Sequence, residues 1–93
     1  MKELSLENYK IVLDETSGKI SEISDKENSL KLSGSIWEVE TADKEFLTID
    51  DMESFSFSIE DKIILIWQKG DFKVIINFFC EDDKLKSNIS VFS

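Results

Sequence analysis

The sequence of 93 residues contains no histidine and no proline, and it has one cysteine and three glycines. Without histidine there is no imidazole to activate a serine or cysteine nucleophile or to bind a metal ion. Gly18, Gly34 and Gly70 are isolated from one another, so they form no phosphate-binding loop. We therefore predict that the chain is not an enzyme and that it has no catalytic residue, no cofactor and no metal site.

The single cysteine, Cys80, cannot form a disulfide within the chain. It ends an apolar run, so we interpret it as a small buried apolar residue rather than as a reactive thiol. The N-terminal segment Met1–Asn8 lacks the apolar core of a signal peptide, and no run approaches the ~20 apolar residues of a membrane span. We predict a soluble protein without disulfides, for which the cytoplasm is the default location.

Charge of one sign dominates the chain. Lys and Arg number 11 and Asp and Glu number 20, which gives a net charge of −9. Such a charge repels phosphate groups, so we expect neither nucleic acid nor an anionic membrane as a partner. The acidic clusters are Asp50-Asp51, Glu60-Asp61 and Glu81-Asp82-Asp83. Neighbouring carboxylates at hairpin tips are typical of solvated turns, and no calcium-loop spacing accompanies them.

Alternating apolar and polar residues are abundant in the second half of the chain. Period-two alternation with β-branched and aromatic residues, interrupted by short polar turns, predicts an antiparallel meander. We predict its strands at Phe55–Ile59, Ile63–Trp67, Phe72–Cys80 and Leu85–Phe92.

The first half predicts shorter strands. They lie at Tyr9–Leu13, Lys19–Ser24, Leu30–Leu32, Ser35–Glu40 and Phe46–Ile49. Ile20 and Ile23 are three residues apart, which favours a β-bulge over a flat strand. Altogether we predict one all-β domain over residues 1–93, an antiparallel β-sandwich or part of a supersandwich with about seven or eight strands and no substantial helix.

The two middle strands of the meander are apolar on both faces. Ile63, Leu65 and Trp67 face one way, and the opposite face carries a second apolar set, Ile64, Ile66, Ile75 and Phe79. Strands of this kind need cover on both sides, and a short sandwich covers only one face of each sheet. We predict that these four residues form a docking face, covered by the N-terminal hairpin, a second copy of the chain or a further domain.

The last predicted strand is an edge that is open to pairing with a further strand, because it ends in Phe92 without a residue that blocks strand pairing. We expect residues 1–93 to be the N-terminal module of a larger protein, with a complete small protein as the alternative. Two aromatic residues, Trp37 and Tyr9, are candidates for stacking on sugar rings. Trp67 shares its face with aliphatic residues and is assigned to the core.

The order of these features resembles a known family. The segments Asn8–Asp14, Thr16–Ile20 and Ile23–Lys26, then Trp37–Val39, Phe55–Phe57, Leu65–Trp67 and Leu85–Val91, are similar to the N-terminal β-sandwich of bacterial carbohydrate-active proteins, the galactose-mutarotase-like supersandwich found ahead of glycosidase catalytic domains. The resemblance implies an accessory domain that packs on a catalytic domain. No catalytic residue carries over, since the histidine of a mutarotase is absent.

Three functions remain open from the sequence. The first is a non-catalytic accessory module of a carbohydrate-processing protein that packs against a neighbouring domain. The second is a small all-β protein that acts as a homodimer or through another protein–protein contact. The third is an independent carbohydrate-binding module, which requires Trp37 or Tyr9 to be exposed.

Overall fold

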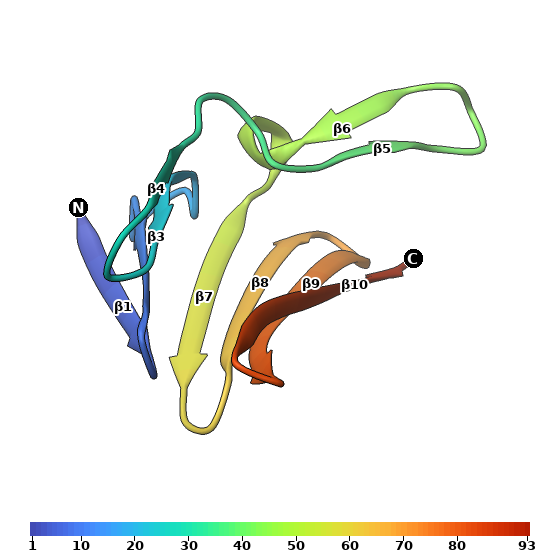
Figure 1. Cartoon of the computed structure of the whole chain (residues 1–93). Helices are drawn as coiled ribbons and strands as arrows, with labels where there is room; N and C mark the ends of the chain where they lie inside the picture. The colour runs from blue at the N-terminus through green and yellow to red at the C-terminus, as the bar shows by residue number, and fades with distance from the viewer.

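The computed structural model describes all 93 residues and is built almost entirely from antiparallel strands (Figure 1). Two four-stranded sheets pack against each other, with strand orders β1-β2-β3-β4 and β10-β9-β8-β7, and a two-stranded arm, β5-β6, lies between them in the sequence. We call them the N-terminal sheet, the C-terminal sheet and the arm. Their strands are β1 Lys2–Leu6, β2 Tyr9–Leu13, β3 Ile20–Ser24, β4 Ser29–Lys31, β5 Glu38–Glu40, β6 Phe46–Thr48, β7 Ser54–Ile59, β8 Ile63–Lys69, β9 Phe72–Glu81 and β10 Lys84–Phe92. The predicted all-β, sandwich-like fold is confirmed.

The bulge predicted in the second strand of the N-terminal hairpin is present. Val12 pairs with Glu22 and Leu13 pairs with Ile20, so Ser21 has no partner residue on β2. The unpaired residue shifts the alternation of inward and outward side chains by one position, so Ile20 and Ile23 lie on the same face. Ile20 is buried, and Ile23 packs against the core.

Three local predictions were wrong. Lys2–Leu6, for which no strand was predicted, forms strand β1, and its Leu4 and Leu6 are buried in the core. The predicted strand Ser35–Glu40 is reduced to Glu38–Glu40. The segment Ile49–Asp51 is a single turn of 3-10 helix rather than strand and connector. With β1 added to the nine predicted segments, the chain has ten strands, more than the seven or eight expected for the fold as a whole.

The C-terminal sheet has the predicted faces. Its inner face carries Ile63, Leu65 and Trp67, all at 0% exposure, and these residues pack against the N-terminal sheet. Thirteen buried hydrophobic residues from both sheets and the linkers form one core. The indole N–H of Trp67 donates a hydrogen bond of 2.9 Å to the carbonyl oxygen of Ser17, which ties the β2–β3 turn to the middle of the opposite sheet.

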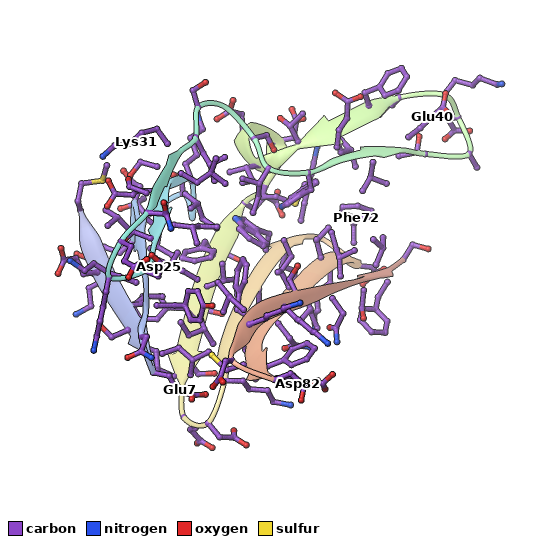
Figure 2. All side chains as sticks on the ribbon, viewed as in Figure 1. Glu7, Asp25, Lys31, Glu40, Phe72 and Asp82 are labelled. Atoms are coloured by element: carbon purple, nitrogen blue, oxygen red, sulfur yellow. The ribbon has the colours of Figure 1, made fainter.

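The arm projects from the sandwich and gives the molecule an elongated shape of 43 × 23 × 19 Å. Figure 2 shows Glu40 at its far end, away from both sheets. Its base is anchored, because Trp37 on one side and Ile49 on the other are buried. The Ser35 hydroxyl connects the two sides: it donates to the Trp37 carbonyl oxygen and accepts the Ile49 backbone N–H at 3.1 Å.

Two turns of the N-terminal sheet are closed by aspartates. Asp14 Oδ1 accepts backbone N–H groups from Thr16 and Ser17 at 2.8 and 3.0 Å, and Asp25 Oδ1 does the same for Glu27 and Asn28 at 2.8 and 2.7 Å. These hydrogen bonds favour the ionised carboxylate and lower the pKa of both side chains.

Acid is therefore expected to weaken both turns. A carboxyl group whose pKa is lowered by folding contributes stability that is present above its unfolded pKa of about 3.9 and is lost as the pH falls through the folded pKa. In urea unfolding, the double variant Asp14→Asn, Asp25→Asn should lose less stability than wild type between about pH 6 and about pH 2.5. Asp61→Asn is the control, because the Asp61 carboxylate, unlike those of Asp14 and Asp25, accepts no hydrogen bond. An acid response of the double variant equal to that of wild type would contradict this account.

Candidate docking surfaces

The predicted docking residues lie together on the outer face of the C-terminal sheet. Ile66 pairs directly with Ile75 across β8 and β9, and Ile64 pairs with Asn77, which places Ile64 diagonally between Ile75 and Phe79. The four side chains are partly buried by their neighbours, and none of them is in the core or packs against it. We call Ile64, Ile66, Ile75 and Phe79 the docking patch.

No element of the chain covers the docking patch. The N-terminal hairpin, which was predicted as one of three possible covers, belongs to the N-terminal sheet and packs on the opposite, inner face. Neighbouring strands reduce the exposure of the patch from the sides, since β8 and β9 are the central strands of the sheet. The side of the patch that points away from the N-terminal sheet remains open to solvent or to a partner.

The outer face also differs in charge from the rest of the molecule. Along its four strands the outer face presents sixteen side chains, of which three are lysines and only one, Glu81, is a carboxylate, although the chain has 20 carboxylates. They are Ser54, Ser56, Ser58, Ile64, Ile66, Gln68, Lys73, Ile75, Asn77, Phe79, Glu81, Lys84, Lys86, Asn88, Ser90 and Phe92. Glu81 reaches Lys86 from the rim at 2.8 Å. Depletion of charge around an apolar centre is the composition found in the core of protein interfaces.

The size of this face suits a modest interface. Four strands about 4.8 Å apart and about eight residues long make a surface of about 20 × 25 Å. A partner that covered it would bury about 1,000 Å² over both molecules, near the lower limit for a specific interface and within the range of contacts between domains.

The acidic clusters lie at separate places and do not converge. Asp50 forms an ion pair of 2.8 Å with Lys19, Glu60-Asp61 occupies the β7–β8 turn, and Glu81 pairs with Lys86. The structure holds no group of three or more carboxylate or cysteine side chains arranged to bind a metal ion. Burial, with a smaller contribution from Glu7, raises the pKa of the half-buried Cys80 thiol, which disfavours the reactive thiolate.

The two candidate sugar-stacking residues have different positions. Trp37 is 6% exposed and packs edge-on against Trp67, with ring centroids 5.8 Å apart, so it offers no open ring face to a sugar. Its indole N–H is buried without a hydrogen-bond partner. Tyr9 is half-exposed, and its hydroxyl donates to the Asp83 carbonyl oxygen at 2.9 Å, which ties β2 to the β9–β10 turn. The structure does not bring the two rings into one site.

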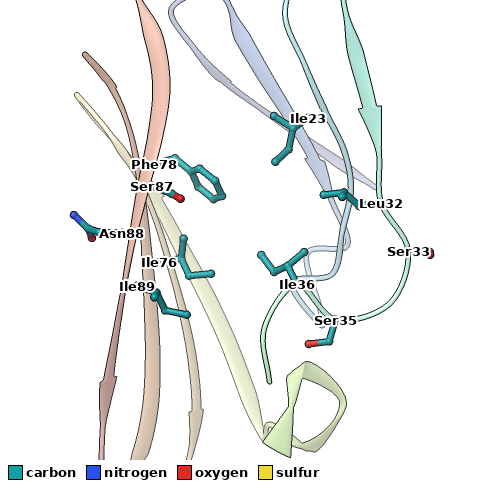
Figure 3. A pocket seen from close by; sticks show the side chains of 10 residues that line it. All are labelled: Ile23, Leu32, Ser33, Ser35, Ile36, Ile76, Phe78, Ser87, Asn88 and Ile89. Atoms are coloured by element: carbon teal, nitrogen blue, oxygen red, sulfur yellow. The ribbon is translucent and has the colours of Figure 1, made fainter. Parts of the chain in front are cut away.

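A second surface was not predicted from the sequence. The sheets diverge beside β10 and leave an open cleft of about 470 Å³ (Figure 3). Ile23, Leu32 and Ile36 line one wall, and Ile76, Phe78 and Ile89 line the other. Two features of the sequence relate to this cleft: the alternating apolar residues of β10 and the shortness of β4, which has only three residues. They predict a cleft only once it is known that these strands lie on facing sheets.

No protein-family model, no curated protein and no solved structure matches this chain. The resemblance to the galactose-mutarotase-like supersandwich therefore stays a prediction. No helical segment has the length and apolar character required to cross a bilayer.

Proposed function

We propose that the chain is a non-catalytic β-sandwich module that acts by association, with a neighbouring protein domain packed on the outer face of its C-terminal sheet. One observation carries this proposal: the docking patch lies at the centre of an almost carboxylate-free face that the chain itself leaves uncovered. The sequence resemblance adds that the neighbour is the catalytic domain of a carbohydrate-processing protein, with this chain as its accessory module.

Burial of the docking patch against a neighbouring domain would release enough free energy to stabilise the contact between them. Complete burial of an exposed Ile or Phe side chain contributes about 1.5–3 kcal/mol. The four side chains of the patch are already partly covered by their neighbours, so they retain only part of that amount. Linkage within one polypeptide raises the effective concentration of the neighbouring domain, and a contact of this size is then sufficient.

The proposal predicts that the chain is joined to a neighbouring domain in one polypeptide, and its test uses the protein that contains both. Ile66→Lys should lower the melting temperature of the adjacent domain and speed amide exchange in β8 and β9, because it places a charge in the centre of the contact. Ala42→Lys adds the same charge at the exposed tip of the arm and should have no such effect. Equal behaviour of the two variants would remove the proposal.

Self-association is the competing outcome, and it is tested on the isolated chain. Light scattering after size exclusion should give the mass of one chain at all concentrations tested. A dimer that Ile66→Lys dissociates would assign the outer face to a second copy instead. A further titration with oligosaccharides should leave the fluorescence of the buried Trp37 and Trp67 unchanged.

A further inference from the structure

The inter-sheet cleft follows the free edge of β10. A second hollow of about 490 Å³, formed by Tyr9, Lys84, Leu85 and Lys86, shares Ile23, Phe78 and Ser87 with the cleft. Together they make one groove that extends along β10 from Lys84 to Ile89. Its floor is apolar, and the half of it that ends at Ile89 is lined by no charged residue.

Strand β10 has no partner on the groove side. It is the edge strand of its sheet and pairs only with β9. A nine-residue edge therefore presents unpaired backbone N–H and C=O groups. Beside these groups, Ile89 and Val91 on the inner face of β10 are 51% and 47% exposed. Figure 3 shows Ile89 turned toward Ile36 across the cleft, while Asn88 points to the outer side.

We propose that this groove binds an extended polypeptide strand that adds to the edge of β10. Such a strand would form backbone hydrogen bonds with β10, and every second side chain would enter the cleft between the two sheets. The occupant is a peptide segment of another protein with apolar residues at alternate positions. This site is separate from the docking patch and does not depend on the function proposed above.

Charge decides between this occupant and a second copy of the chain. Two chains of net charge −9 repel each other, whereas a neutral or basic segment is attracted. At the Tyr9 end of the groove, Asp25, Glu27 and Asp83 lie near Lys26, Lys84 and Lys86, so this end is close to balanced in charge. The attraction of a basic segment therefore comes from the net charge of the whole chain.

The probe for this site is the capped peptide Lys-Val-Thr-Val-Thr-Val-Thr-Val-Lys, whose binding is followed by calorimetry and by amide exchange of β10. It should bind at least tenfold more tightly than a peptide of the same composition with the four valines contiguous. Replacing both lysines of the peptide with glutamate should weaken binding at low salt, and added salt should reduce the difference.

Two variants of β10 provide the matched control. Ile89→Lys places a charge inside the groove and should weaken binding of the alternating peptide at least tenfold. Ser90→Lys adds the same charge on the outer face of the same strand and should change affinity less than threefold. Circular dichroism verifies that both variants fold. Absence of binding, equal affinity for the two valine peptides, or equal loss in both variants would overturn the proposal. A dimer of the chain dissociated by Ile89→Lys would overturn it in favour of a second copy.

Discussion

Replacement of Gly18 by alanine is expected to lower the free energy of unfolding by about 3–6 kcal/mol, a large part of the 5–15 kcal/mol typical of a domain. Gly18 has a φ of +77°, and a Cβ added there would lie 2.5 Å from both the Phe55 ring and Trp67 Nε1. The backbone strain costs about 1–2 kcal/mol and overpacking about 1–3 kcal/mol. Displacement of Trp67 would also break its hydrogen bond to Ser17 and leave a buried donor without a partner.

Gly34 provides a matched control for this prediction. Its φ is also +77°, but no atom lies within 4 Å of an added Cβ. Gly34→Ala therefore tests the backbone strain alone and should cost about 1–2 kcal/mol. Chemical denaturation of the two variants and of wild type gives both values. Equal losses would show that the β2–β3 turn does not pack against Trp67 as the structure has it.

The second large effect is expected from two adjacent residues of β8. Leu65→Thr should cost about 3–5 kcal/mol, because it leaves a cavity in the core and buries a hydroxyl group. Leu65 is 0% exposed on the inner face. Ile66→Thr keeps a β-branched side chain on the uncovered outer face and should cost about 1 kcal/mol or less in the isolated chain.

Denaturant midpoints of these two variants measure the difference between the faces. If Ile66→Thr were as costly as Leu65→Thr in a chain shown to be monomeric, something within the chain would have to cover the outer face. If both variants were mild, Leu65 would not belong to the core. In a protein that joins this chain to the proposed neighbouring domain, the cost of Ile66→Thr should rise, because that domain would bury this position.

The back half of the fold follows from residue patterns that are local. Phe55–Ile59 alternates apolar residues with serines, so its strand and its inward face are readable without other information. The double-sided character of Ile63–Trp67 and of Phe72–Cys80 is equally local, and it predicted that Ile64, Ile66, Ile75 and Phe79 share the outer face. Turns close these strands at short range, which leaves little freedom in the pairing.

The front half depends on contacts that the sequence does not display. Lys2–Leu6 has only two apolar side chains, and it becomes a strand because Tyr9–Leu13 offers it a partner. Trp37 continues the alternation of its segment but leaves the strand to pack against Trp67. The cleft beside β10 arises from how the two sheets overlap, a property of the assembled pair that neither sheet encodes alone.

Because the base of the arm is anchored, the length of the β5–β6 hairpin can change without a change in the two sheets. Ser35, Trp37 and Ile49 hold the root, while Glu40–Glu45 contacts neither sheet through a buried residue. Each residue added to both strands would extend the reach of the hairpin by about 3.3 Å. We expect insertions there to change what the arm contacts and to leave the sandwich folded, because no buried residue lies in this segment.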